Sequence, residues 1–246
     1  MHIILTGATG TVGAPVMRNC LASPAVTRLS ILSRRQFTLP SGEGLDTQKA
    51  EIIVHDDFAL YPSTLTDRLQ GADAVIWAQG ISQTQVSKQE YIRITYDYPL
   101  AAAKAFSTLS KDRKFNFVYV SGADQTEKTF TLFGKIKGRA ELALRKLPSE
   151  SSYSTLRVFN VRPGFVDPSP LADKREQSAL IRFSHAVLTP LLRALAPSNV
   201  SPADVLAQVL VDLATGDGEP VPPGTGIEDE GRLVRCVGVR QLGGLR

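Results

Sequence analysis

The sequence is poor in the residues from which metal and disulfide sites are built. Its 246 residues include two cysteines, Cys20 and Cys236, and three dispersed histidines, His2, His55 and His185. The cysteines lie far apart, and neither has a spacing typical of zinc ligands. We therefore expect no metal site and a reduced, intracellular protein, with Cys20 as a buried thiol on the apolar face of a first helix.

Long hydrophobic runs and runs of one charge are also absent. No apolar stretch reaches the roughly 20 residues that a membrane-spanning helix needs, and a first strand at residue 2 or 3 leaves no signal peptide to expect. Lysines and arginines are scattered over a chain of net charge +4, so nothing indicates nucleic-acid binding. We expect a cytoplasmic protein with a small-molecule substrate.

The N-terminus, in contrast, is rich in glycine. The apolar run Ile3–Leu5 leads to Gly7, Gly10 and Gly13, and a helical pattern follows. Glycine can turn the chain with positive φ, lets phosphates approach the backbone, and allows a helix to pack closely on a strand. Since helix N-termini attract anions, this segment indicates a site for a dinucleotide pyrophosphate rather than a plain βα turn. The expected contacts come from Gly7, Thr9, Gly10, Thr11, Val12 and Gly13.

Strand and helix patterns alternate along the first 165 residues. This order favours an α/β fold with a doubly wound parallel sheet of the Rossmann type and right-handed crossovers. The predicted strands are 3–6, 29–33, 51–55, 74–78, 115–121 and 154–161, and the predicted helices are 12–22, 64–70, 91–109 and 132–146.

The rhythm of the sequence changes after residue 164. The pattern predicts an amphipathic helix at 179–195, a helix with Ser201 as N-cap and Pro202 at its first position that stops at Gly216, and a late strand at 233–239. We expect residues 1–165 to form the dinucleotide-binding core. Residues 166–246 would form a small C-terminal lid or substrate region of the same structural domain.

The residues after the second strand indicate which dinucleotide binds. A carboxylate there accepts hydrogen bonds from the ribose 2′-OH of NAD, whereas arginine pairs with the 2′-phosphate of NADP. This sequence has Ser33, Arg34 and Arg35 at that point and no acidic residue. NADP is therefore favoured over NAD, and the alternative is two solvated arginines on a loop.

The ends of the next two strands should line the same crevice. Asp57 and Phe58 follow the third strand, where Asp57 would accept from the adenine amino group and Phe58 would flank the ring. Ala78, Gln79 and Gly80 follow the fourth strand and would let the cofactor pass over the backbone.

Several segments together resemble the extended and atypical short-chain dehydrogenase/reductases. Within that superfamily they are most similar to the Tat-interacting oxidoreductase-like proteins and their fungal mitochondrial relatives, which leaves a mitochondrial association open. The resemblance runs from residue 1 to about 165, and it implies NAD(P) binding with Pro163 and Gly164 at the border of the nicotinamide. It rests on the glycine segment, on residues 91–106 and 120–123, on Lys-Ile-Lys-Gly-Arg-Ala-Glu at 135–141 and on Val-Arg-Pro-Gly at 161–164.

In that superfamily, carbonyl reduction uses a serine, a tyrosine and a lysine. The tyrosine phenol transfers a proton, the lysine four residues later lowers the phenol pKa and binds the ribose, and the serine polarises the substrate oxygen. Here Ser121 and Lys137 match the pattern, but Phe133 occupies the tyrosine position. A phenyl ring has no proton to give, so Lys135, Ser121, a lid residue such as His185, or water would have to supply it.

The resemblance favours an NADP(H)-dependent oxidoreductase acting on a small carbonyl or alcohol, with Ser121 and Lys137 as catalytic residues. Two alternatives stay open, namely a non-redox isomerase, dehydratase or cyclase on the same scaffold and a non-catalytic NADPH-binding regulatory protein. Helices 91–109 and 132–146 would pair in a homodimer, or the alanines at 101–103 would simply pack on the sheet.

Overall fold

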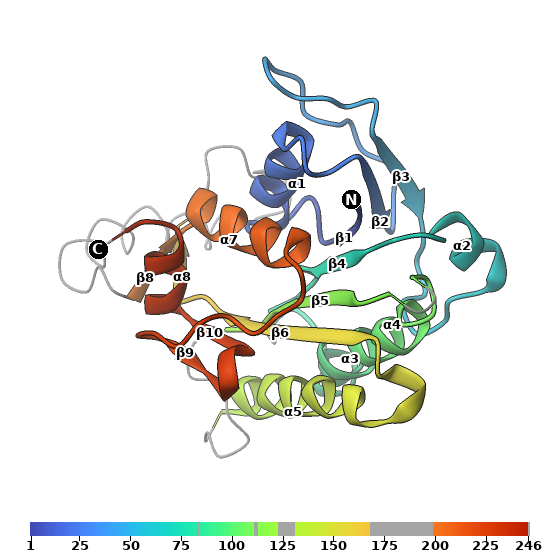
Figure 1. The fold of residues 1–246 in the computed structure, drawn as a ribbon. Helices are drawn as coiled ribbons and strands as arrows, with labels where there is room; N and C mark the ends of the chain where they lie inside the picture. The colour runs from blue at the N-terminus through green and yellow to red at the C-terminus, as the bar shows by residue number, and fades with distance from the viewer. Residues whose placement is uncertain (83, 111–112, 123–130, 168–198, 246) are drawn as a thin grey trace.

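A twisted, mostly parallel sheet forms the centre of the molecule (Figure 1). The computed structural model describes residues 1–82, 84–110, 113–122, 131–167 and 199–245. In these residues eight strands follow the order β3-β2-β1-β4-β5-β6-β10-β9, and every pair is parallel except β10 and β9. The strands are β1 (His2–Thr6), β2 (Arg28–Ser33), β3 (Ala50–Val54), β4 (Ala74–Trp77), β5 (Phe115–Val120), β6 (Leu156–Arg162), β9 (Ile227–Glu228) and β10 (Leu233–Arg235), with β7 (Phe165–Asp167) and β8 (Val200–Pro202) as a separate parallel pair.

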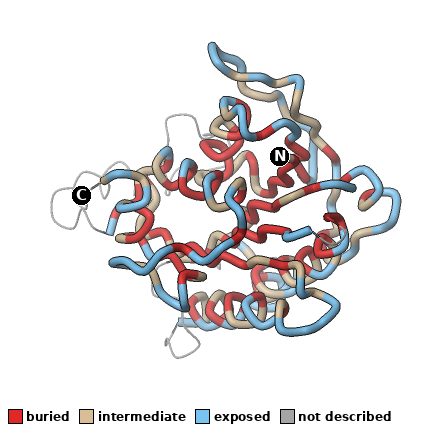
Figure 2. Tube along the Cα trace, in the orientation of Figure 1, coloured by how far each residue is buried: buried red, intermediate tan, exposed pale blue. Residues whose placement is uncertain are grey.

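Helices cover both faces of this sheet, which confirms the predicted doubly wound α/β fold. Figure 1 shows α1 and α7 on one side of the sheet, with α3, α4 and α5 on the other. Figure 2 shows that buried residues follow the central strands and the inner helix faces. The helices are α1 (Gly13–Ala22), α2 (Ser63–Arg68), α3 (Lys88–Ile92), the π-helix η1 (Arg93–Asp97), α4 (Tyr98–Phe106), α5 (Leu132–Lys146), α7 (Ala203–Thr215) and α8 (Cys236–Leu242), with short 3₁₀ turns at 147–149, 151–153 and 229–231.

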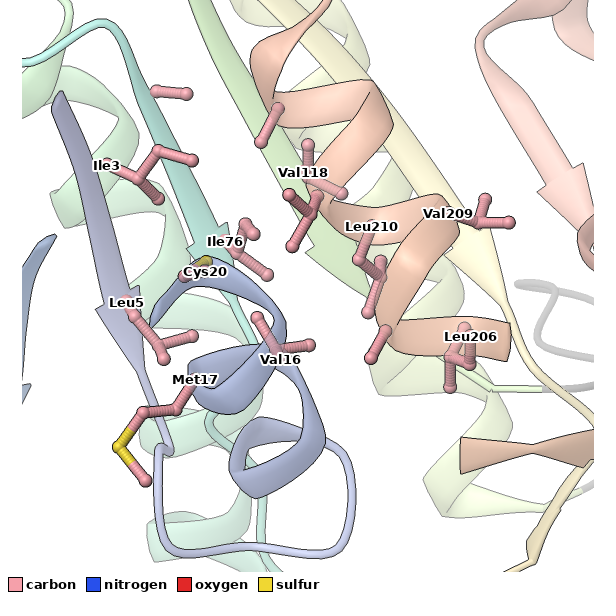
Figure 3. Packing of buried hydrophobic residues seen from close by; sticks show 14 of the residues in the cluster. Ile3, Leu5, Val16, Met17, Cys20, Ile76, Val118, Leu206, Val209 and Leu210 are labelled. Carbon is pink, nitrogen blue, oxygen red and sulfur yellow. The ribbon is translucent and has the colours of Figure 1, made fainter. Parts of the chain in front are cut away.

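Alternate side chains along the strands point to opposite faces of the sheet and pack in two separate hydrophobic cores. Ile3 and Leu5 pack toward α1 and α7, whereas Ile4 between them packs toward the other layer. Figure 3 shows the first core, in which Cys20 of α1 lies among aliphatic side chains. Cys20 is fully buried, as predicted, and burial raises the pKa of its thiol to about 12.

Aromatic rings dominate the second core. Trp77 of β4 and Phe117 of β5 stack with ring centroids 6.3 Å apart, and Phe58 meets Trp77 edge-on. Ala102 and Ala103 of α4 are fully buried in the same cluster. These two alanines therefore pack inside the fold, which favours the sheet-packing interpretation over a helix interface between two protomers.

The predicted strand at 233–239 is wrong beyond Arg235. The strand β10 pairs with β6 only as far as Arg235 opposite Arg162, and α8 begins at Cys236. The Asn160 amide donates to β10 at the Arg232 carbonyl oxygen, but the Gly164 amide, further along the same side of the chain, donates to Ser201 Oγ instead. The ladder therefore ends here, and the chain after Arg235 turns into a helix.

The predicted N-cap at Ser201 is also wrong. The helix α7 begins at Ala203, and the residue at its N-cap position, Pro202, makes no side-chain capping bond. The hydroxyl of Ser201 is used elsewhere, since it accepts from the Gly164 amide at 3.3 Å and lies 3.2 Å from the Cys236 sulfur. Tertiary contacts thus occupy the Ser201 hydroxyl, which the local sequence pattern had predicted to cap the helix. The predicted end of α7 at Gly216 is confirmed.

The predicted helix at 179–195, with His185, lies outside the described residues. The described part of the region after residue 165 packs with the core, since α7 buries seven residues and β10 joins the main sheet. Within the described part of the chain, no helix is long and apolar enough to span a membrane, and no cluster of metal-ligating side chains occurs.

We expect the buried imidazole of His2 to make the fold acid-sensitive. His2 is 7% exposed, its Nε2 lies 2.8 Å from Ser30 Oγ, and burial lowers its pKa to about 4. The unfolded chain binds this proton near pH 6.5, so stability is complete above that pH and falls as the pH drops toward 4. The loss attributable to this group is at most about 3 kcal/mol.

Urea unfolding of the wild type and His2→Asn at pH 7 and pH 4.5 checks this expectation. The wild type should lose more stability between the two pH values than the variant. Equal losses in the two proteins would contradict it.

Candidate cofactor and active site

The glycine turn between β1 and α1 is fixed by backbone contacts. Gly7 has φ +69°, and a Cβ there would lie 2.5 Å from the Ala78 carbonyl oxygen. A Cβ at Gly13 would lie 1.9 Å from the Gly7 carbonyl oxygen. The Gly10 amide donates to that same oxygen at 3.0 Å. The first and third glycines are therefore required by the turn itself, as the sequence predicted.

The position of Gly10 is less crowded than that of Gly13, and α1 starts without a side-chain cap from its N-cap residue. A Cβ at Gly10 would lie 3.3 Å from its nearest neighbour, so packing alone demands glycine less strictly there than at Gly13. The helix begins behind Val12, whose side chain makes no capping hydrogen bond, and its first turn contains no acidic residue. This uncapped, positively polarised helix end fits a diphosphate group.

The residues after β2 form a turn with two exposed arginines. Ser33 Oγ donates to the Arg35 carbonyl oxygen at 2.8 Å and fixes this turn. The side chains of Arg34 and Arg35 are exposed at the carboxyl end of the sheet. Their placement fits the predicted contact with a ribose 2′-phosphate.

The two predicted ligand contacts after β3 lie in different surroundings, with Asp57 at the candidate site and the Phe58 ring in the core. Asp57 Oδ1 accepts from the Ala59 amide at 3.1 Å and pairs with Arg93 at 3.3 Å, so the carboxylate is held in place. Phe58 is 2% exposed, and its ring contacts His55, Trp77 and Tyr98. In this structure the phenyl ring serves the aromatic core, and a contact of Phe58 with adenine would fall to its backbone.

Buried polar atoms without partners mark the ends of β4 and β5. Gln79 Oε1 and Ser121 Oγ are both buried, and neither has a hydrogen-bond partner in the described parts of the chain. Ala78 lies against Gly7, and Gly80 is exposed next to them. A buried polar group without a partner is costly, so these atoms fit a polar ligand at this edge.

The structure brings the predicted serine and lysine together. Lys137 Nζ of α5 donates to the Ser121 carbonyl oxygen at 2.8 Å and lies 5.0 Å from the Phe133 ring centroid. Burial lowers the pKa of Lys137 to about 8, against a smaller opposing effect of the Glu141 carboxylate. Serine, lysine and phenyl ring thus share one site at the end of β5.

The structure places Tyr91 against Phe133, a contact that no spacing along the chain indicates. The two ring centroids are 5.9 Å apart, and Tyr91 is fully buried with a hydroxyl that has no hydrogen-bond partner among the described residues. Burial raises its pKa to about 12. Tyr119, the other tyrosine near the serine, donates to the Thr95 carbonyl oxygen at 3.2 Å inside η1.

A buried ion pair joins the two sequence segments that carried the family resemblance. Glu141 of α5 is 4% exposed, and its carboxylate oxygens lie 3.0 and 3.1 Å from Arg162 Nε and 2.5 Å from Nη2. Spacing along the sequence could not pair them, since 21 residues separate the two. This contact fixes α5, and Lys137 with it, against the end of β6.

Tight backbone packing explains the glycine after β6. A Cβ at Gly164 would lie 2.1 Å from the Asn199 carbonyl oxygen, where the chain before β8 crosses it. Pro163 is buried beside it. The contact of Pro163 and Gly164 with a nicotinamide therefore stays a prediction, because this packing alone accounts for the glycine.

Fungal proteins from biosynthetic gene clusters are similar to this chain. Leucinostatins biosynthesis cluster protein T of Purpureocillium lilacinum is 33% identical, with 98% of this chain and 94% of that protein covered. Botcinic acid biosynthesis cluster B protein 16 of Botryotinia fuckeliana is 38% identical over 59% of this chain and 98% of its own length. Protein fmp52, mitochondrial, of Emericella nidulans is 28% identical over 91% of this chain and 92% of its length. No family model matches the sequence.

Solved structures share the fold at low identity. The PhqB reductase domain from Penicillium fellutanum superposes with a TM-score of 0.63 at 14% identity. The match covers 87% of this chain and 64% of that domain. The dTDP-glucose 4,6-dehydratase DesIV of Streptomyces venezuelae, solved with NAD, gives 0.63 at 15% identity over 99% of this chain and 79% of that one. The chain therefore has the fold of NAD(P)-dependent reductases and dehydratases.

We expect alanine to be far more damaging at Gly13 than at Gly10. The new methyl group of Gly13→Ala would collide with the Gly7 carbonyl, at a cost of about 3 kcal/mol or more. Gly10→Ala needs a shift of only a few tenths of an ångström, and Gly224→Ala, whose Cβ would lie 3.8 Å from its nearest neighbour, is the control. Urea unfolding measures the three costs, and a Gly13 variant as stable as the control would contradict the observed turn.

Removing one partner of the Glu141–Arg162 pair should destabilise the protein strongly. Glu141→Leu removes the hydrogen-bonded counter-charge of a largely buried guanidinium, which keeps only the longer-range attraction of Glu228 and Asp229, at an expected cost of about 3 kcal/mol. The exposed pair of Glu228 and Arg235 is a matched control, and Glu228→Gln should cost about 1 kcal/mol or less. In a double-mutant cycle, adding Arg162→Met should recover part of the loss. A cost equal to the control's would show that the pair does not hold α5 in place.

Proposed function

This chain belongs to the family of leucinostatins biosynthesis cluster protein T, and we propose that it is an NADP(H)-dependent oxidoreductase acting on a small carbonyl or alcohol. The proposal places it with the atypical short-chain dehydrogenase/reductases, in the Tat-interacting oxidoreductase-like branch. One observation carries it. The start of α1 after β1 and the Lys137–Ser121 pair after β5 lie at the carboxyl ends of two strands that flank β4 in one sheet, where such sheets bind dinucleotides.

The chain's own residues divide the binding of this cofactor between them. The turn at 7–13 would hold the diphosphate with backbone amides, Arg34 and Arg35 would hold the 2′-phosphate, and Asp57 would accept from the adenine. Lys137 would bind the nicotinamide ribose, and a bound nicotinamide would supply or accept the hydride. The remaining proposed contacts are Thr9, Thr11, Val12, Ser33, the Phe58 backbone, Ala78, Gln79, Gly80, Pro163 and Gly164.

Ser121 would orient the substrate oxygen next to this cofactor. Its Oγ is buried and has no partner within the described part of the chain, so a substrate carbonyl or hydroxyl would satisfy it. Residues 166–246 would shape the substrate pocket. Because two relatives are named for the biosynthesis of leucinostatins and of botcinic acid, we propose an intermediate of small-molecule biosynthesis as the substrate.

The affinity for NADPH should depend on the two exposed arginines. Arg34→Ala/Arg35→Ala removes charge-assisted hydrogen bonds to phosphate, each worth about 1.5–3 kcal/mol, so the Kd for NADPH should rise by at least about tenfold and the Kd for NADH should stay unchanged. Gly10→Ala should weaken both, because its methyl group meets the diphosphate. Calorimetric titration of each variant measures these constants.

The control for this titration is Arg113→Ala. Arg113 is also exposed but pairs with Asp73 before β4, at the opposite edge of the sheet, so its loss should leave both affinities unchanged. A wild type that binds neither dinucleotide below millimolar concentration rules out the proposed function. Tight binding of NADPH without reduction of any carbonyl would indicate the regulatory alternative, and turnover without a change in nicotinamide absorbance would indicate the non-redox one.

A further inference from the structure

Reduction of a carbonyl needs a proton at the oxygen, and Phe133 cannot give one. Its ring occupies the same face of α5 as Lys137, one helical turn away, and lies 5.0 Å from the lysine nitrogen. The ammonium group of Lys137 therefore lies over the ring that stands where the superfamily has a phenol.

The other described groups near this position are poor proton donors. Tyr91 is fully buried with a pKa of about 12, and Tyr119 already donates to the Thr95 carbonyl. The hydroxyl of Ser121 is a weak acid, and its Oγ has no hydrogen-bond partner among the described residues that would return a lost proton to it. Lys135 is exposed, about half a helical turn from Lys137, and so points away from the site.

Lys137, in contrast, has donors in reserve and a fixed position. An ammonium carries three N–H groups, and the hydrogen bond to the Ser121 carbonyl uses one of them. That bond also places the nitrogen beside the residue whose Oγ would receive the substrate oxygen. The buried Glu141–Arg162 pair holds the helix that carries it.

The charges around Lys137 favour an easy loss of its proton. Burial lowers its pKa to about 8, and the Glu141 carboxylate one turn further along α5 raises it only in part. Arg162 of β6 neutralises that carboxylate. The phenols that face α5 from α3 and β5, Tyr91 and Tyr119, stay neutral because burial raises the pKa of both. The ammonium can therefore exchange its proton near neutral pH.

We propose that Lys137 is the proton donor of this enzyme, taking the role that a tyrosine has in its superfamily. This inference rests on the proposed function. In reduction, the hydride adds to the carbonyl carbon while a Lys137 N–H bond breaks and an O–H bond forms at the substrate oxygen, directly or through one water. The lysine becomes a neutral amine and regains a proton from solvent. In oxidation the neutral amine accepts the hydroxyl proton.

The first test needs no substrate. Lysines labelled with ¹³C at Cε report the protonation of each side chain by NMR, and the Lys137→Met spectrum assigns the signal. Lys137 should titrate near pH 8, with and without saturating NADPH. A Lys137 that titrates at the ordinary pKa of a lysine side chain, about 10.4, overturns the proposal.

The second test separates proton donation from positioning. Lys137→Arg keeps the positive charge and can bind a ribose, but a guanidinium does not release its proton near neutrality. We expect NADPH affinity within a few-fold of wild type, and reduction of 4-nitrobenzaldehyde and a panel of small ketones slower by about 100-fold or more. Lys135→Arg is the matched control on the same helix and should change neither.

Two further readouts identify the chemistry of the donor. Added alkylamines should rescue reduction by Lys137→Ala, and the rescue should depend on the pKa of the amine. The wild-type rate should fall tenfold per pH unit above the pKa of Lys137, and Phe133→Tyr should move this fall to another pH by supplying a phenol.

The outcomes distinguish this inference from the function on which it rests. Absence of NADPH binding by the wild type removes the proposed function and the inference together. Normal binding without reduction of any panel carbonyl also removes both, since it indicates the regulatory alternative. Normal binding and reduction with an active Lys137→Arg variant, or with no amine rescue, overturns the inference alone, since Lys137 would then only position the cofactor.

Discussion

The close approach of backbone at Gly7 and Gly13 is the constraint on which the functional site depends. It sets how α1 leaves β1, because any Cβ at Gly13 would strike the Gly7 carbonyl and any Cβ at Gly7 would strike Ala78 of the neighbouring strand end. The helix therefore starts directly above the sheet edge, without a side-chain cap from its N-cap residue Val12. Helix N-termini of this kind favour anions. The geometry of the turn therefore favours an anionic ligand at the start of α1.

A second constraint positions the side chains proposed to be catalytic. The buried pair of Glu141 and Arg162 ties α5 to β6, and Lys137, one turn before Glu141, consequently reaches the end of β5. Burying two charges is favourable only with good geometry, and the three short contacts of this pair supply it. Lys137 is itself partly buried beside this pair, and burial lowers the pKa of its ammonium group.

Local patterns predicted well where burial repeats along the chain and less well where distant contacts compete. The helix 132–146 is observed with the predicted bounds because one amphipathic face meets the sheet throughout. The predicted helix 91–109 is instead three pieces, since the π-helix at 93–97 adds a residue to one turn where the chain packs against α5. Ser201 looked like a helix cap because its neighbours along the sequence allowed it, but Gly164 and Cys236 take its hydroxyl.

The sequence by itself determined the alternation of strands and helices and the glycine turn. These depend on residues close together along the chain, and their spacing is enough to identify them, whereas Ser121 and Lys137 were predicted from a family resemblance. Only the tertiary structure decided that Tyr91 lies on Phe133, that Phe58 serves the core, and that Glu141 pairs with Arg162. Such contacts join segments far apart in sequence. Which of them form depends on how the helices of the two layers pack against the two faces of the sheet.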